Sequence, residues 1–403
     1  MAEKKSKNQV GTDSGRRRLL RGPIGKLLMI LAGVFCGLLL CELILRVSGY
    51  SNANFYISDP VVGAALRPNA EGWWTKEGHE YIRINSQGLR DREHTKAKPA
   101  NTVRIAVLGD SYAEALQLPM EKAFWAIIEA RLRECGALQG RDVEVINFGV
   151  SGYGTAQELL TLREKVWDYG PDIVLLAVTT LNDISDDSRA LKQSNDIPYF
   201  VLSDGHLVLD DSFRNSRMYR FRGSALYYPV SWLKDHSRVV QAYYEVREAI
   251  SVWLQYRSRP AMPGELGIRE DTYREPRDDV WRNAWRVTEA LIVLMRDEVK
   301  ERHAKFFVVT LSGGLQVHPD PNVRQEMAKR GVSVLYPDLR VKDLCERESI
   351  PVLVLAPALQ LYAEQNKAFL HGFDKNLGGG HWNELGHRIA GEMMADWLCR
   401  ELG

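Results

Sequence analysis

Five short, continuously apolar segments separated by helical stretches constrain the fold of this chain more than any other feature. The segments are 103–108, 143–148, 173–178, 306–311 and 352–355, and the helical stretches include 122–134, 156–167 and 382–398. Continuously apolar strands are typical of strands buried on both faces, and strands that alternate with helices form parallel sheets. We therefore predict an α/β fold with a parallel sheet covered by helices on both faces.

A long insertion interrupts the alternation between the third and fourth predicted strands. Within it, the apolar stretch 199–209 surrounds Asp204-Gly205, which predicts a β-hairpin, and an aromatic-rich helical stretch follows at 243–256. The apolar residues of 281–299 recur at helical spacing and predict a core helix that precedes the fourth strand. We predict that residues 185–276 form a cap beside the edge of the sheet where the chemistry takes place.

The N-terminal part of the chain predicts a membrane anchor. Residues 1–26 carry eight Lys or Arg and only two acidic residues, and residues 27–45 are apolar except for Glu42. Nineteen helical residues span about 28 Å, close to the thickness of a hydrocarbon core. We predict a disordered basic tail over 1–25 in the cytoplasm, a transmembrane signal-anchor helix over 26–46, and an extracytoplasmic remainder. The alternative is a cleaved signal peptide, although no small-x-small cleavage site follows the apolar run.

Residues 47–102 predict a β-rich juxtamembrane lead-in that packs on the domain formed by 103–403. Alternation over 81–84 predicts a small strand. Trp73 and Trp74 are expected to pack within this region, and the alternatives are interfacial anchoring or stacking on a sugar.

Net charge and cysteine content restrict the classes of partner and cofactor. The chain has a net charge of +1, and the part after the basic tail is mildly acidic, which gives no reason to expect nucleic-acid binding. Outside the apolar run, Cys135, Cys345 and Cys399 leave room for one disulfide, whose pairing the sequence does not decide. No Cys/His cluster suggests a metal site, and no metal, nucleotide or organic cofactor is expected.

A glycine turn with a polar tip follows the first predicted strand. Gly109, Asp110 and Ser111 come directly after the apolar residues, and the glycine permits a tight turn that presents the serine. Open α/β sheets place their chemistry at the carboxyl ends of parallel strands. Ser111 is therefore a candidate functional residue.

Four separated blocks together resemble the SGNH/GDSL hydrolase family. In chain order they are VLGDSY around Ser111, INFGVSGYG at 146–154, TTLND at 179–183 and GGGHWNELGH at 378–387. The resemblance covers about residues 103–400, interrupted by the cap. It implies a three-layer sandwich around a flavodoxin-like parallel sheet.

The resemblance also implies a role for each matched residue. Ser111 would be the nucleophile, and His381 would be the base that takes its proton. The oxyanion would be stabilised by the backbone N–H groups of Ser111 and Gly152 and by the side-chain amide of Asn182. The alternative for Gly152 is a role in shaping its loop, and the alternative for Asn182 is helix capping. His387 is expected to be structural.

The chain departs from the family pattern at the acid partner of the histidine. The family has an aspartate three residues before this histidine, and here that position is Gly378. Asp374 is the weak candidate for the acid, because the glycines at 378–380 are flexible enough to bring it close. A backbone carbonyl could orient the ring instead, which would leave a Ser-His dyad. We favour the dyad.

These observations predict a membrane-anchored serine esterase that acts outside the cytoplasm. The expected substrate is a small-molecule or polysaccharide ester, above all an O-acetyl or other O-acyl group on a carbohydrate, cleaved through an acyl-serine intermediate. The alternatives are a lipid esterase or thioesterase, an O-acetyltransferase of an envelope polysaccharide, and an inactive glycan-binding component. Oligomeric state is left open.

Overall fold

The computed structural model describes residues 22–258 and 269–403 of the chain. The predicted tail therefore lies almost wholly outside the described residues. The centre of the fold is a five-stranded sheet made of β5 (Thr102–Leu108), β6 (Asp142–Asn147), β7 (Ile173–Thr179), β10 (Lys305–Leu311) and β11 (Val352–Val354). All neighbouring pairs are parallel, in the order β11-β10-β7-β5-β6. This is the flavodoxin-like order, and the five predicted strands are confirmed with ends that shift by one residue at most.

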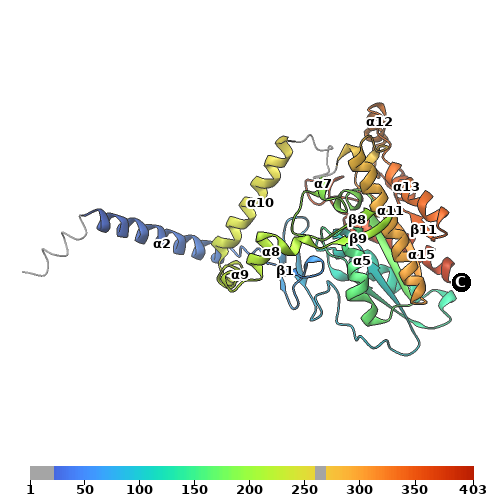
Figure 1. Ribbon diagram of the computed structural model, residues 1–403, viewed down its shortest axis with the longest axis horizontal. Coiled ribbons are helices and arrows are strands. Elements are labelled where there is room, and N and C mark those ends of the chain that lie inside the picture. Colours follow the sequence, from blue (N-terminus) through green and yellow to red (C-terminus); the bar gives the residue numbers. More distant parts are fainter. Residues whose placement is uncertain (1–21, 259–268) are drawn as a thin grey trace, which may run out of the picture.

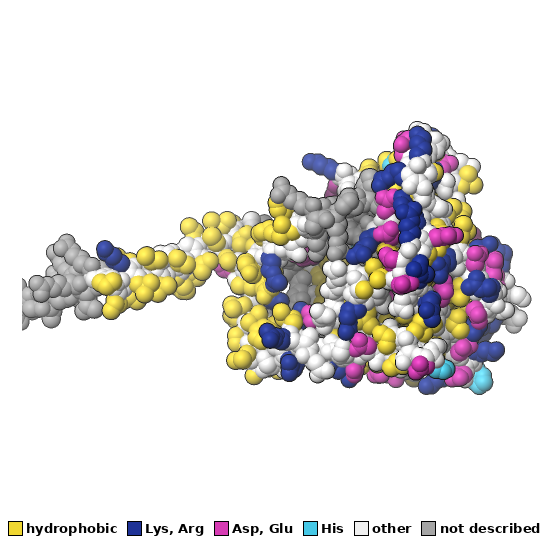
Figure 2. All heavy atoms as spheres, turned by 45° about the horizontal axis from the view of Figure 1, so that its top comes forward, with side chains coloured by type: hydrophobic (Ala, Val, Ile, Leu, Met, Phe, Trp, Pro, Cys, Tyr) yellow, Lys and Arg dark blue, Asp and Glu magenta, His cyan; other side chains and the backbone are white. Residues whose placement is uncertain are grey.

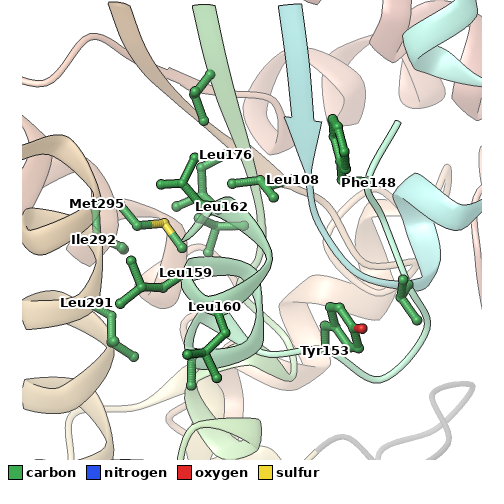
Figure 3. Close-up of a cluster of buried hydrophobic side chains, with 14 of the residues drawn as sticks. Leu108, Phe148, Tyr153, Leu159, Leu160, Leu162, Leu176, Leu291, Ile292 and Met295 are labelled. Atoms are coloured by element: carbon green, nitrogen blue, oxygen red, sulfur yellow. The ribbon is translucent and has the colours of Figure 1, made fainter. Parts of the chain in front are cut away.

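Helices cover both faces of the sheet, because successive strand residues point to opposite sides. On one face, Ala106 and Leu108 of β5 pack with α5 (Thr155–Glu164), α11 (Asp279–Glu301) and α13 (Tyr336–Arg347). Figure 3 shows Leu108 and Leu176 on this side together with Leu159 of α5 and Met295 of α11.

On the other face, Ile105 and Val107 pack with α4 (Phe124–Leu132), α14 (Ala356–Asn366) and α15 (Glu384–Leu402). A disulfide between Cys135 and Cys399 joins the end of the α4 segment to α15, while Cys345 is a buried free thiol. The helices predicted over 122–134, 156–167, 281–299 and 382–398 are all present in these layers. A further helix, α12 (Pro321–Lys329), lies between β10 and α13.

The lead-in consists of two hairpins that pack on the main core. β1 (Tyr56–Asp59) pairs with β2 (Gly63–Leu66), and β3 (Glu71–Trp74) pairs with β4 (Glu80–Arg83). Phe55, Leu66 and Ile82 belong to the same buried cluster as the sheet residues of the α5 face. Trp74 packs against that cluster, whereas Trp73 is 43% exposed and stacks on His79.

The insertion contacts the main domain, the lead-in and α2. It contains α6 (Asp183–Asp186), α7 (Arg189–Lys192), the hairpin of β8 (Tyr199–Ser203) and β9 (His206–Asp210), α8 (Arg217–Arg222), α9 (Tyr228–His236) and α10 (Arg238–Ser258). The β8–β9 hairpin confirms the predicted turn at Asp204-Gly205. Arg67 of the lead-in donates two hydrogen bonds of 2.8 Å to the Asp235 carboxylate at the end of α9.

The apolar N-terminal stretch forms α2 (Pro23–Val47), which projects from the body in Figure 1. Among the described residues this is one helix long and apolar enough to cross a membrane, and no part of its apolar stretch is buried. Length and composition alone fit a signal sequence as well as an anchor.

Candidate active site

Ser111 begins α3 (Ser111–Glu114), after the two residues Gly109 and Asp110 that follow β5. Asp110 is the N-cap of this short helix, and its carboxylate accepts a hydrogen bond of 3.0 Å from the backbone N–H of Tyr112. The same carboxylate accepts one of 2.9 Å from the Thr179 hydroxyl at the end of β7. Because β5 and β7 are neighbours on either side of the point where the strand order reverses, Asp110 holds the serine turn at that switch point.

His381 lies next to Ser111 although the two are 270 residues apart in the chain. Its Nε2 is 2.7 Å from the Ser111 Oγ, which is hydrogen-bond distance for proton transfer between base and nucleophile. Two neighbours hold the segment that carries the ring. Trp382 is completely buried, and Asn383 is the N-cap of α15, with its side chain accepting a hydrogen bond of 3.0 Å from the Gly386 N–H.

Glu77 occupies the other side of the His381 ring. Its carboxylate accepts a short hydrogen bond from Nδ1, and both side chains are 27% exposed. Glu77 belongs to the turn between β3 and β4, in the lead-in. The structure thus brings a serine, a histidine and a glutamate into the order of a catalytic triad, with the acid contributed by a segment that sequence reasoning left outside the site.

The contact between Glu77 and His381 changes the pKa of both groups. Burial raises the pKa of Glu77, but hydrogen bonds from His381 and Gln117 outweigh it, so that the net pKa is lowered. Burial lowers the pKa of His381, but the hydrogen bond and charge of Glu77 outweigh that effect and the net pKa is raised. The pair therefore favours an ionised carboxylate beside a ring that readily holds a proton.

Two glycines allow the Glu77 turn to approach the histidine so closely. Gly380 has a φ of +74°, and a Cβ there would lie 2.3 Å from Oε1 of Glu77. Gly78 has a φ of +67°, and a Cβ there would lie 2.2 Å from the backbone oxygen of Gln117. The glycine run before His381 thus leaves the space that the Glu77 carboxylate fills.

The two alternatives proposed from the sequence for the Nδ1 partner are both replaced by Glu77. Asp374 is exposed, in a stretch where residues 374–377 all face solvent, and the hydrogen bond at Nδ1 goes to Glu77. No backbone carbonyl takes that position among the described residues. Glu77 carried no local signal, because it lies in a polar turn 304 residues away from the histidine.

The three groups expected to stabilise the oxyanion differ in whether they already make a hydrogen bond. The backbone N–H groups of Ser111 and Gly152 make no hydrogen bond within 22–258 and 269–403, and Gly152 is exposed with a φ of +78°. The Asn182 amide instead donates to Asp110 at 3.2 Å and to Asp186 at 3.4 Å. Asn182 occupies the N-cap position of α6, but its side chain does not cap that helix.

A buried glutamate connects α3, the helix that begins at Ser111, to the loop that contains Gly152. Glu114 is fully buried and accepts hydrogen bonds from the Tyr56 hydroxyl at 2.9 Å and from the backbone N–H of Ser151 at 3.1 Å. The Ser151 hydroxyl makes a further short hydrogen bond to the same carboxylate. Burial raises the pKa of Glu114 to about 7. This residue, which sequence reasoning missed, holds the loop that presents the Gly152 N–H.

The remaining titratable groups near the site have structural surroundings. His387 is buried, accepts a hydrogen bond of 3.2 Å from the Phe124 N–H at Nδ1, and has a pKa that burial lowers to about 3. In the described part of the chain, no group of three or more His, Cys, Asp or Glu residues is arranged to hold a metal ion.

Comparison with known proteins gives a partial similarity. No family model matches the chain. An arylesterase from Vibrio mimicus is 36% identical over 73 residues, which are 18% of this chain and 34% of that protein. The chain therefore matches about a third of the length of this curated relative.

Several solved structures are similar to the chain at low sequence identity. An acetyl xylan esterase is 13% identical with a TM-score of 0.37, over 73% of this chain and 98% of that protein. TesA is 12% identical with a TM-score of 0.37, over 74% and 99% of the two chains. A lipolytic protein of the G-D-S-L family from Desulfitobacterium hafniense is 11% identical with a TM-score of 0.35, over 73% and 99%. TM-scores this low do not establish a fold, so the assignment of the fold depends on the strand order described above.

Proposed function

We propose that this chain is a serine esterase of the SGNH type, anchored in a membrane, which hydrolyses an ester through an acyl-serine intermediate. The observation that carries the proposal is the distance of 2.7 Å between the Ser111 Oγ and the His381 Nε2, with Glu77 on the opposite ring nitrogen. An aliphatic hydroxyl becomes a useful nucleophile only when a base of this kind stands beside it. The four sequence blocks and the partial identity with an arylesterase point to the same chemistry.

In the first half of the reaction, Ser111 Oγ attacks the ester carbonyl while Nε2 of His381 takes the hydroxyl proton. Glu77 holds Nδ1–H and stabilises the imidazolium that forms. The backbone N–H groups of Ser111 and Gly152 stabilise the oxyanion, and Asn182 joins them when its amide turns from Asp110. The imidazolium then gives its proton to the leaving alcohol, which leaves an acyl-serine.

In the second half, a water molecule attacks the acyl-serine carbonyl and His381 takes the water proton. Collapse of this intermediate returns the proton to Ser111 Oγ and releases the carboxylic acid. Both halves use the same base and the same oxyanion donors, so the site needs no group beyond those described.

The proposed location follows from α2 and from the disulfide. The basic residues before α2 favour a cytoplasmic N-terminus, which places the body outside the cytoplasm. A disulfide between Cys135 and Cys399 is expected in an oxidising compartment. Near its end α2 is tied to the body, since the Glu42 carboxylate accepts a hydrogen bond of 2.9 Å from the Ser237 hydroxyl. These contacts favour a retained anchor over a cleaved signal peptide.

The proposed substrate is an O-acetyl or other O-acyl group on a carbohydrate. A glycine at position 378, where the family has an aspartate, favours the inactive alternative. The contact between Glu77 and His381 supports an active enzyme instead, because it provides a carboxylate at the same ring nitrogen. A lipid esterase remains the rival in substrate class. We also propose that residues 185–276 determine which ester is hydrolysed. Their contacts with the lead-in, which carries Glu77, support this role.

The test uses the full chain in detergent or nanodiscs. A fluorophosphonate probe is expected to label Ser111 covalently, with Ser111→Ala and His381→Ala as the unlabelled references. Hydrolysis of acetylated xylo-oligosaccharides is then compared with hydrolysis of acetyl and long-chain p-nitrophenyl esters. Absence of any adduct on Ser111 in folded protein would contradict the esterase. A preference for long acyl chains would support the lipid esterase.

A further inference from the structure

α10 turns a polar face toward the lead-in and an apolar face outward, the opposite of an amphipathic surface helix in a water-soluble protein. Its inner face is polar, because three residues spaced four and three apart make hydrogen bonds or ion pairs with the lead-in. Gln241 accepts a hydrogen bond of 3.1 Å from the Asn52 N–H, Glu245 accepts a short one from the Tyr50 hydroxyl, and Glu248 pairs with Lys76 at 2.7 Å.

The opposite face of α10 is apolar and exposed. A helix turns about 100° per residue, so the residues at 243, 246, 250, 253 and 254 lie on the side away from Gln241. Each of these side chains is more than half exposed, namely Tyr243, Val246, Ile250, Trp253 and Leu254. A soluble amphipathic helix buries such a stripe against the core instead.

The helix before it continues the apolar surface. In α9, Tyr228 is 77% exposed and Trp232 is 59% exposed, and Leu226 just before α9 is 76% exposed. Figure 2 shows hydrophobic side chains gathered on the part of the body that adjoins the projecting helix α2. We call the exposed apolar residues of 226–233 and 243–254 the α9–α10 face. Exposed apolar side chains that gather on one surface mark an interaction site.

The end of α2 lies against the junction of α9 and α10. The Glu42 carboxylate accepts hydrogen bonds from the backbone N–H groups of Arg238 at 3.1 Å and Val239 at 3.0 Å, in the first turn of α10. Glu42 is five residues before the end of α2, which corresponds to about 7.5 Å along a helix. The start of α10 is therefore level with the last apolar turns of α2, and Figure 1 shows α10 running across the direction of α2 rather than continuing it.

We propose that the α9–α10 face lies in the headgroup region of the bilayer that α2 crosses. This inference rests on the proposed anchor. Trp and Tyr side chains favour the membrane–water interface, and an interfacial helix lies along the surface with its apolar side down. Arg247 on α10 and Arg220 on α8 are exposed cations that complement the phosphates of anionic lipids.

This placement also sets the position of the catalytic acid relative to the bilayer. Glu248 of α10 pairs with Lys76, the residue next to Glu77. The inner face of α10 therefore contacts the turn that carries Glu77, while its outer face faces lipid. The site is held at a constant height above the membrane, where a substrate in or near the envelope surface can reach it.

The test is photocrosslinking of the full chain in nanodiscs of phosphatidylcholine and phosphatidylglycerol that contain a phospholipid with a diazirine near the headgroup. Mass spectrometry is expected to find lipid adducts on α2 and on peptides that contain 226–233 and 243–254. Adducts on α2 alone would overturn the α9–α10 proposal while leaving the anchor intact. If adducts are absent from α2, the anchor itself fails.

Variants sharpen the result. Trp232→Ser combined with Ile250→Ser is expected to lower the adducts on α9 and α10 by about fivefold or more, without lowering those on α2. The matched control is Leu339→Ser, an apolar residue of α13 that is 45% exposed. Figure 1 shows α13 on the far side of the body from α2. Fluorophosphonate labelling of Ser111 verifies that each variant is folded. Crosslinks between two copies through α10, without lipid adducts there, would assign the face to a second copy and overturn the proposal.

Discussion

The two segments that meet at His381 differ in how they are held. Ser111 follows β5, a strand whose last six residues are all buried, and Asp110 connects its turn to the neighbouring strand β7. Glu77 lies in a turn between two four-residue strands of the lead-in, and contacts from distant segments position it. Ser111 is therefore positioned by regular structure, whereas Glu77 is positioned by packing between segments far apart in the chain. We therefore expect substitutions in distant segments to disturb the position of Glu77 more than that of Ser111.

The largest expected effect separates Glu77 from Asp374. Glu77→Gln removes the charge that stabilises the imidazolium, and the corresponding change in serine proteases lowers turnover by about 10⁴. We expect a loss of about 10³–10⁴ in kcat for p-nitrophenyl acetate in Glu77→Gln. Asp374→Asn, at an exposed position, should change kcat by less than about twofold. The opposite ranking of the two variants would return Asp374 to the site.

The pH dependence of the rate gives a second readout of Glu77. In the wild type, the net pKa of His381 is raised, so activity is lost as pH falls through that raised value. Without the hydrogen bond and charge of Glu77, the lowering of the ring pKa by burial is opposed only by the smaller effects of the Asp110 and Glu114 charges, so the His381 pKa falls. The acid limb of kcat/KM in Glu77→Gln should therefore move to lower pH. A purely structural role for Glu77 would lower the rate without moving that limb.

The next effect concerns the Asn182 amide, which in this structure faces carboxylates rather than an open oxyanion position. If it turns toward the substrate, Asn182→Ala should lower kcat by about 10²–10³ with little change in KM. Thermal unfolding provides the control, because a residue that only tied Asp110 to Asp186 would lower Tm and leave kcat nearly unchanged.

A smaller effect tests the space reserved for the Glu77 carboxylate. Gly380→Ala places a Cβ 2.3 Å from Oε1, so the turn must shift, and kcat should fall by about 10–100-fold. Gly331→Ala is the matched control, because its φ is +71° and nothing lies within 4 Å of its Cβ. Both substitutions cost about 1 kcal/mol of stability through backbone strain. Equal kcat values in the two variants would contradict the claim that close packing at Gly380 positions the Glu77 carboxylate.

The smallest effect falls on stability and concerns the buried Glu114. Its pKa is raised by burial from 4.5 to about 7, so between these values the folded state holds a proton that the unfolded state has released. Glu114 therefore stabilises the fold fully below about pH 4.5 and progressively less as pH rises to 7, by up to about 3 kcal/mol. The decrease of Tm between pH 5 and 8 should be shallower in Glu114→Gln. Part of the slope should persist, since the pKa of Asp187 is also raised by burial to about 7. Identical slopes would contradict this account.

Much of the fold could be predicted because its signals are local. The five strands of the sheet are continuous apolar runs, the hairpin at Asp204-Gly205 is a turn between two apolar arms, and α11 shows its helical period directly. The positions of Ser111 and His381 at a strand end and before a helix follow from the same local patterns. The lead-in was less predictable, because its strands are short and the alternation of its residues is weak.

The sequence by itself determined the parallel sheet, the candidate pair of Ser111 and His381, and an apolar helix long enough to cross a membrane. Burial of apolar strands and the geometry of turns are properties of neighbouring residues, so they can be read along the chain. Only the tertiary structure decided that Glu77 lies at His381, that Cys135 pairs with Cys399 and that the apolar side of α10 faces outward. Each of these depends on which distant segments come together in three dimensions, and the disulfide and the Glu77 contact join residues 264 and 304 positions apart.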